Sequence, residues 1–420
     1  MRPVPLVGRG LFPLDDELEL VPGTLTPHLH ASLVRLGSWL PFGQAARELG
    51  WLTRASGGAL VSASVAQRLT EAAGAAYVAE QTAEVERLDQ QPTPEPAGPA
   101  IQQVSVDGAM ISLVGKQWGE VKTLAIGTVL REATGEVRAR DVSYFSRRTD
   151  HATFRRLALV ETQRRGVGTA GVVVAVMDGA DWLQGFIDFH RHDAVRVLDF
   201  PHAVEYLTRA SHEAFGSGTA ATSDWIGQQA HALKHDGPTP VLAALRALPA
   251  GAHRDLALGY LEPRLAQLQY PTFRAAGYPI GSGMVEGANK VVVQARLKGS
   301  GIHWAPRHVD PMVALRTIVC ADRWEEAWPR ISARLRADAR ARSQQLRAQR
   351  LAAHPATQVA ADPPTTPSVP PSPAASLPAL IPPALIPPAR PKQIVNGRPT
   401  SAHPWKRRFL PHRPSSPAEN

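Results

Sequence analysis

The stretch Gly281-Ser-Gly-Met-Val-Glu-Gly-Ala-Asn-Lys290 joins a glycine turn to a segment of helical periodicity, which continues through Val291-Val-Val-Gln-Ala-Arg-Leu-Lys298. Glycine lets the backbone turn sharply, and serine is a favoured N-cap, so we expect a helix whose start is capped by the Ser282 hydroxyl. Glu286 then lies one turn into the helix. It either supports the helix N-terminus or, beside other carboxylates, binds a metal ion.

The rest of this segment has two sides at helical spacing. One is an apolar stripe of Met284, Ala288, Val291, Val292 and Ala295. Glu286 lies on roughly the opposite side, together with Asn289, Lys290 and Arg296. The pattern therefore predicts an amphipathic helix.

Two Asp-Gly pairs upstream each follow an apolar run. Asp107-Gly108 follows 104–106, and Asp178-Gly179 follows 171–177. Both pairs are good turn dipeptides, and one interpretation is that they are only turns. In the other, each aspartate ends a strand and projects with Glu286 into a crevice at the sheet edge. Such carboxylates suit Mg²⁺ or Mn²⁺, and two such ions catalyse phosphodiester chemistry without a nucleophilic side chain.

Periodicity predicts a mixed α/β sheet in the middle of the chain. The expected strands are 104–107, 110–114, 120–130, 171–177 and 194–199. The expected helices are 150–164, 180–190, a wholly helical segment 204–275, one from Glu286, 306–321 and an arginine-rich helix 324–353.

The two ends of the chain differ from this middle part. Residues 1–89 predict short helices, the last starting near Ser62 or Ser64, and this order fits either a DNA-binding helix-turn-helix or a plain helical hairpin. The proline-spaced segment 90–100 is a predicted linker. Residues 354–420 are too rich in proline, alanine and serine to form a core and are predicted to be disordered.

Composition limits the possible classes of protein. With 420 residues, of which 44% are hydrophobic, the chain is long enough for two or three domains, and its net charge of +9 suits a polyanionic partner. A single cysteine, Cys320, excludes internal disulfides and a cysteine-built zinc site. No apolar run could span a bilayer, and the N-terminus lacks a signal-peptide pattern, so we expect a soluble cytoplasmic protein.

Several motifs become specific when they are taken together. They are Val106-Asp-Gly-Ala109, Met177-Asp-Gly-Ala-Asp-Trp182, Leu198-Asp-Phe-Pro-His-Ala203, the stretch 281–290, Arg296-Leu-Lys-Gly-Ser-Gly-Ile-His-Trp304, Gly10-Leu-Phe-Pro-Leu-Asp15 and His403-Pro-Trp405. This set resembles the motifs of insertion-sequence transposases of the IS-Kra group, which are relatives of the Mutator-like enzymes. The similarity extends over most of the chain except the proline-rich tail.

The resemblance implies a ribonuclease-H-like catalytic domain at 101–323, with 204–275 as a helical insertion. It also implies a DNA transposase that cuts transposon ends and joins them to target DNA by two-metal phosphoryl transfer. Asp107, Asp178 and Glu286 would be the catalytic, metal-binding triad, with Mg²⁺ or Mn²⁺ as cofactor. The partner would be DNA, bound by a homo-oligomer in the nucleoid.

Further residues have a possible role in positioning DNA or its phosphates. Asp199 and His202 match a paired motif of related transposases; alternatively, Asp199 caps the helix near Pro201 and His202 is structural. Trp304 could stack on an unpaired base or belong to the core. The full set is Asp199, His202, Asn289, Lys290, Arg296, Lys298 and Trp304.

One departure from the family pattern concerns zinc. A cysteine pair that binds zinc commonly precedes the Gly-Leu-Phe-Pro-Leu-Asp motif, whereas residues 3–10 carry no cysteine. This departure puts recognition of specific DNA ends in doubt more than catalysis. A catalytically inactive, transposase-derived DNA-binding protein and a metal-dependent nuclease without strand transfer are therefore the alternatives.

Overall fold

The structure is a computed structural model. It describes residues 25–54, 60–353, 394–395 and 398–399. Contacts divide the chain into two units, Met1–Pro355 and Ala356–Asn420. The described part of the second unit is one antiparallel pair of short strands, β6 Ile394–Val395 and β7 Arg398–Pro399. Otherwise the predicted disordered tail, the motif at His403 and the motif at Gly10 lie outside the described residues.

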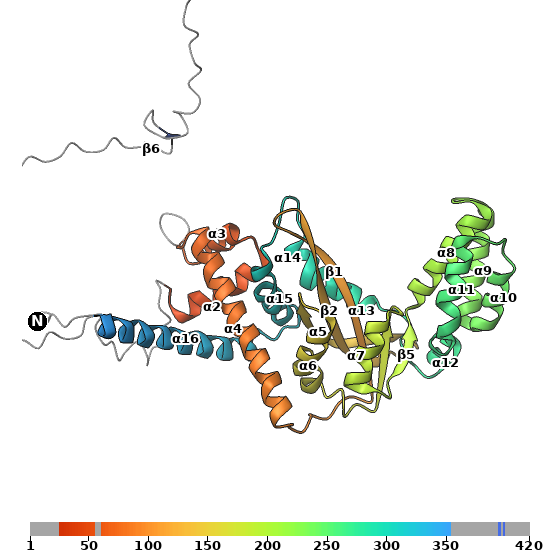
Figure 1. Cartoon of the computed structure of the whole chain (residues 1–420), viewed down its shortest axis with the longest axis horizontal. Coiled ribbons are helices and arrows are strands. Elements are labelled where there is room, and N and C mark those ends of the chain that lie inside the picture. The colour runs from red at the N-terminus through yellow and green to blue at the C-terminus, as the bar shows by residue number, and fades with distance from the viewer. Residues whose placement is uncertain (1–24, 55–59, 354–393, 396–397, 400–420) are drawn as a thin grey trace, which may run out of the picture. The chain divides into compact units, whose positions relative to one another are not determined.

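A five-stranded mixed sheet forms the centre of the first unit, in the order β3-β2-β1-β4-β5 (Figure 1). The strands are β1 Ile101–Leu113, β2 Gln117–Arg131, β3 Val137–Arg147, β4 Val172–Met177 and β5 Val195–Leu198. The first three are antiparallel neighbours, β4 runs parallel to β1, and β5 runs parallel to β4. The predicted mixed α/β sheet is confirmed.

Strand β1 differs from the prediction of two strands with a turn at Asp107-Gly108. It runs without interruption, with Asp107 opposite Thr123 and Gly108 opposite Lys122 of β2. The turn, and the prediction that Asp107 ends a strand, are wrong because the ladder to β2 satisfies the backbone through this point. A Cβ at position 108 would lie 2.2 Å from Glu120 Oε1, so a larger residue there would displace the Glu120 side chain.

Helices cover both faces of the sheet. On the face of Val104 and Val106 lie α5 His151–Leu157, α6 Leu159–Arg164 and α7 Asp181–Arg191, with Phe154 and Phe186 in the shared core. The opposite face of β1 and β2 packs against a second group of helices. These are α13 Gly283–Ala288, the π-helix η2 Asn289–Gln294, α14 Ala295–Leu297 and α15 Pro306–Cys320.

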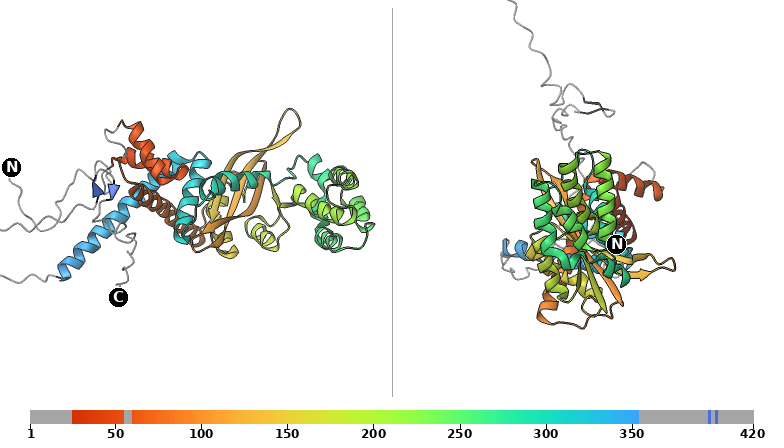
Figure 2. Two further views of the ribbon diagram at one scale, coloured as in Figure 1. Left: turned by 90° about the horizontal axis from the view of Figure 1, so that it is seen from above. Right: turned by 90° about the vertical axis from the view of Figure 1, so that its right-hand side faces the viewer.

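The predicted helical segment 204–275 is confirmed, and its helices pack as one group (Figure 2). They are α8 Phe200–Phe215, α9 Ala220–His235, α10 Pro238–Arg246, α11 Ala252–Leu261, the 3₁₀-helix η1 Glu262–Leu268 and α12 Tyr270–Ala275. Their buried side chains, such as Leu207, Leu245 and Tyr270, share a core with Val174 and Val176 of β4. The group is therefore anchored on the edge of the sheet that holds β4 and β5.

The N-terminal helices are α2 Pro27–Trp39, α3 Phe42–Leu52 and α4 Ala63–Gln90. Of the two predicted starts, Ser62 is the cap of α4, because its Oγ accepts a hydrogen bond from Val65 N (3.3 Å). The arginine-rich helix is confirmed as α16 Trp324–Ala353, and it packs with α15 against α4. The contact between α4 and α15 is close, since a Cβ at Gly74 would meet Pro311 O at 2.1 Å. None of the helices in the described ranges is long and apolar enough to cross a membrane.

The proline-spaced segment after α4 is extended, and it is fastened to the loop between α6 and β4. Glu95 Oε2 accepts a hydrogen bond from Gly168 N (2.7 Å), and Pro96 O accepts one from Thr169 Oγ1 (2.6 Å). A Cβ at Gly98 would meet Gly166 O at 2.3 Å. These contacts fix the position of the proline-spaced segment on the sheet domain.

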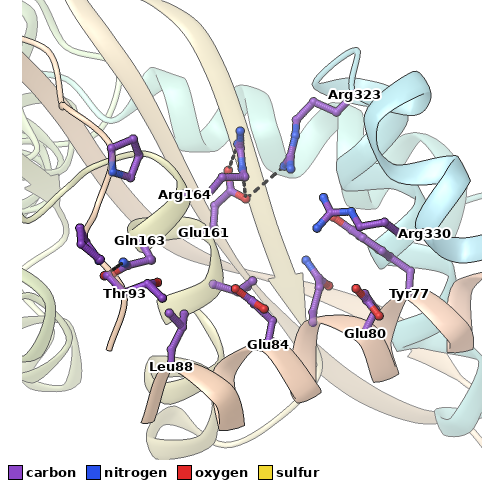
Figure 3. A pocket seen from close by; sticks show the side chains of 14 residues that line it. Tyr77, Glu80, Glu84, Leu88, Thr93, Glu161, Gln163, Arg164, Arg323 and Arg330 are labelled. Atoms are coloured by element: carbon purple, nitrogen blue, oxygen red, sulfur yellow. Dashed lines mark hydrogen bonds and ion pairs between the residues drawn. The ribbon is translucent and has the colours of Figure 1, made fainter. Parts of the chain in front are cut away.

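A buried carboxylate joins the helices of both ends to the sheet domain (Figure 3). Glu161 of α6 is 2% exposed and accepts hydrogen bonds from Arg164 Nε (3.1 Å) and from Arg323 (3.2 Å), which precedes α16. Tyr77 of α4 lines the same pocket. Burial lowers the pKa of Arg323, but its hydrogen bond to Glu326 and the charge of Glu161 outweigh burial and hold that pKa above its ordinary value.

We expect Glu161→Gln to lower the free energy of unfolding by about 1–3 kcal/mol, because it removes the buried counter-charge of Arg323 and leaves that cation paired only with the half-exposed Glu326. Guanidinium denaturation measures the change. The matched control is Glu325→Gln, which removes an exposed carboxylate and should cost less than about 0.5 kcal/mol. Equal stability of the two variants would mean that Glu161 does not hold these helices together.

Candidate active site

Asp107 and Asp178 lie level with each other on neighbouring parallel strands. β1 and β4 are paired in register up to Val104 and Ala175, and three further residues along each strand reach the two aspartates. Neighbouring strands lie about 4.8 Å apart, and side chains at matched positions point to the same face. Both carboxylates therefore project from the face that carries α13 and η2. Asp178 directly follows β4, so the prediction that it ends the buried strand is confirmed.

Asp107 is held by two hydrogen bonds. Gly108 N donates to Oδ1 (2.7 Å), and Asn289 Nδ2 donates to Oδ2 (2.8 Å). Burial raises the pKa of Asp107, and the negative charges of Asp178 and Glu286 raise it further, against the effect of the two hydrogen bonds. All three predicted carboxylates thus interact electrostatically at this site.

Asn289 is the first residue of the π-helix η2, directly after α13, and its side chain is bonded to Asp107. The π-helix η2 has wider turns than an α-helix, so the side chains shift around the axis. Asn289 is 3% exposed and Val291 is 43% exposed, and Ala295 is exposed as well. The predicted stripe is therefore wrong at Val291 and Ala295. The predicted outward positions of Asn289 and of Arg296, which is 6% exposed, are wrong too.

Glu286 is exposed at the N-terminal end of this helical segment. Its Oε1 accepts a hydrogen bond from Ser282 Oγ (3.1 Å). The serine hydroxyl makes no capping bond to the helix backbone, so that prediction is wrong. Ser282 instead orients the glutamate, while its own N–H donates to Asp199 Oδ1 (2.6 Å).

Asp199 is buried, and its hydrogen bonds link three elements. Its side chain accepts from His202 N (2.9 Å) at the start of α8 and from Ser282 N, and its own N–H donates to Met177 O (2.9 Å) at the end of β4. The interpretation of Asp199 as a helix cap is confirmed. His202 lies edge-on to Tyr260, with ring centroids 5.8 Å apart.

The helical insertion is hydrogen-bonded to the turn that carries Asp178. Tyr260 OH accepts a hydrogen bond from Gly179 N (2.8 Å), and Arg264 donates to Gly179 O (2.6 Å). Tyr206 stacks on Tyr260 at 4.0 Å, and the Arg264 guanidinium lies 4.2 Å from the Tyr260 ring centroid. Burial raises the pKa of Tyr260 to about 12, and Asp178 contributes to this rise.

The sequence gives no signal for these two residues. Tyr260 and Arg264 are four residues apart in a helical segment, and Gly179 lies far away along the chain. A Cβ at Gly179 would meet Arg264 Nε at 2.2 Å, so the glycine is required by the contact and not only by the turn.

The remaining predicted residues fall into two groups. Lys290 and Lys298 are exposed. Arg296 and Trp304 are each 6% exposed, and the Arg296 guanidinium lies 5.2 Å from the centroid of the Trp304 ring. The interpretation of Trp304 as a core residue is confirmed.

The donors fit a hard divalent ion in their chemistry, because all are oxygens. Asn289 Oδ1, beside Asp107, is a buried acceptor without a hydrogen-bond partner. In the ranges that the structure describes, however, no group of three or more His, Cys, Asp or Glu side chains is gathered closely enough to hold an ion. A divalent ion held by all three carboxylates would require them to lie closer together than they do here.

We expect Asp107→Asn to raise the free energy of unfolding at pH 7 by about 1 kcal/mol in chelator, because it removes a buried like charge. The folded-state pKa of Asp107 is raised, so the wild-type protein loses stability as pH rises from the ordinary value of 3.8 through that pKa. The variant should lack this loss. Thermal unfolding across pH measures it.

Asp224→Asn, which neutralises an exposed aspartate on α9, is the matched control and should leave the pH profile unchanged. Mn²⁺ should raise the melting temperature of the wild type and of this control more than that of Asp107→Asn. A destabilised Asp107→Asn protein in chelator would contradict the repulsion described here.

We expect Tyr260→Phe to lower the free energy of unfolding by about 1–2 kcal/mol, because it leaves the buried Gly179 N–H without an acceptor. Denaturant unfolding measures the loss. Tyr206→Phe keeps the ring stack and removes a hydroxyl that is not bonded to Gly179, so it should cost less. Equal costs would show that the hydrogen bond does not fasten the Asp178 turn.

No protein-family model matches the chain, and no curated protein matches it. The resemblance to IS-Kra transposases therefore stays a prediction that depends on the motifs quoted above. The geometry adds that the three motif carboxylates, at 107, 178 and 286, come from separate elements, and that the charges of Asp178 and Glu286 raise the pKa of Asp107.

Proposed function

We propose that this protein is a DNA transposase with a ribonuclease-H-like sheet, acting as a homo-oligomer on DNA. The observation that carries the proposal is the meeting of Asp107 and Asp178 at one level of two parallel strands. The bond from Asn289 to Asp107 ties the helix of Glu286 to the same place. This order of strand, strand and helix carboxylates is the one that the motifs imply.

Asp107, Asp178 and Glu286 would hold divalent ions. When bound, two such ions activate an attacking oxygen and stabilise the leaving oxygen of a phosphodiester. Asn289 orients the carboxylate of Asp107, and Ser282 orients that of Glu286. The attacking oxygen would come from water in the first cut and from the freed 3′-hydroxyl in the joining step.

Binding of DNA beyond the site would use the N-terminal helices. The exposed Arg68 near the start of α4 supports this role. The net charge of +9 favours any polyanion and strengthens binding without specificity.

The test is cleavage and joining of labelled transposon-end DNA in Mg²⁺ or Mn²⁺. Asp107→Asn, Asp178→Asn and Glu286→Gln should each lower the cleavage rate by about 10³-fold or more, while DNA affinity in chelator stays within a few-fold of wild type. Asp224→Asn is the control and should cut normally.

The same assay separates the alternatives. Cutting without joining would identify a metal-dependent nuclease. Salt-sensitive DNA binding with no cutting by the wild type would identify an inactive, transposase-derived DNA-binding protein. Normal cutting by any one of the three variants would remove that residue from the mechanism.

A further inference from the structure

A groove lies on the same face of the sheet as the carboxylates, with a volume of about 830 Å³. One wall is the hairpin of β2 and β3, and the other is the segment 278–281 with parts of α9 and α12. Gln103 of β1 lines the groove, four residues before Asp107 and on the same side of the strand. The groove continues along α13, which contributes Met284 and Gly287 to its lining.

Positive charge dominates both walls. Arg131 and Arg138 stand on the hairpin side, and Lys234 and Arg274 on the helical side. The acidic lining residue, Glu136, is already bonded to Arg138 (2.9 Å). Among the described residues, neither Arg131 nor Lys234 is within ion-pair distance of a carboxylate. These two cations are therefore free to bind an anion.

The groove also offers surfaces for planar rings. Tyr144 and Tyr278 line it and are partly exposed. Gly281, Gly283 and Gly287 leave bare backbone on one side, and a Cβ built at any of the three would meet nothing within 4 Å. A flat base could thus approach the backbone here and stack on a tyrosine.

Cations on two walls, aromatic rings and bare backbone are the features that bind single-stranded nucleic acid. The volume is in the range of small-molecule sites, which suits a few unpaired nucleotides and excludes a duplex. A site for phosphate alone would not need the tyrosines or the open glycine segment.

We propose that this groove binds a short single-stranded segment of DNA on the face of the sheet that carries the carboxylates. Arg131 and Lys234 contact its phosphates, and Tyr278 stacks on a base. The choice of DNA, in place of another single strand, rests on the proposed function. The groove and the carboxylates share one face of the sheet, and α13 contributes Met284 and Gly287 to the groove wall.

The test is fluorescence anisotropy of a labelled single strand of about 12 nucleotides, and of the same sequence as a duplex, in EDTA so that nothing is cut. The double variant Arg131→Ala with Lys234→Ala should weaken single-strand binding by about 10-fold or more. The slope of log affinity against log salt concentration should fall by the equivalent of about one to two phosphate contacts. Duplex binding should change much less.

The matched control is Arg209→Ala with Arg246→Ala, which removes two cations from the insertion surface outside the groove. Tyr278→Ala should weaken single-strand binding by about 10-fold without changing its salt dependence, and Tyr278→Phe should restore it. Thermal unfolding checks that each variant is folded.

If the double variant of Arg131 and Lys234 binds the single strand as tightly as the control double variant does, the inference is overturned. This readout is independent of cutting. Loss of single-strand binding in a protein that never cuts would leave the groove assignment standing and remove the proposed function. Unchanged single-strand binding by the groove variant of a protein that cuts would remove the groove assignment and leave the proposed function standing.

Discussion

The parallel pairing of β1 with β4 is the constraint on which the candidate site depends. It sets Asp107 and Asp178 level on one face, at a separation where two carboxylates repel. Repulsion of this kind costs stability unless the backbone is held elsewhere. The strands supply that support, because β1 is bonded to β2 along its whole length and the core residues of β4 are almost fully buried. The hydrogen bonds and buried core of the sheet therefore offset the repulsion between the acidic side chains that it holds together.

Two further contacts fix the carboxylates from outside the sheet. Asn289 approaches Asp107 from the helical layer, and Tyr260 with Arg264 grips the backbone beside Asp178 from the insertion. Asp199 links the two sides, since it bonds the turn before α13 and the start of α8. The insertion is thus mechanically connected to the site, and a displacement of its helices would move the turn of Asp178.

The sequence predicts the parts of this arrangement that depend on local pattern. The buried strand β4 and the long helices follow from apolar periodicity, and the three carboxylates follow from their motifs. The turn at Asp107-Gly108 was wrong because pairing with β2 outweighs the turn preference of two residues. The burial of Asn289 could not be predicted, since the periodicity puts it on the polar side with Glu286 and contains no sign of its tertiary contact with Asp107. The edge strand β3 was not predicted, because its exposed Arg138 and Arg140 interrupt the apolar pattern. The contact of Tyr260 with Gly179 could not be predicted either, because it depends wholly on tertiary packing.

The division of charge over this face explains how a strongly acidic site could accept a polyanion. The carboxylates repel phosphate when they are ionised. Cations at the site itself would pair with the carboxylates and compete with a metal ion. Arg131 and Lys234 instead line a groove that begins beyond Gln103, along the same strand face. A strand held there would gain its binding energy away from the acidic centre, and only the phosphate to be cut would need the metal to neutralise it.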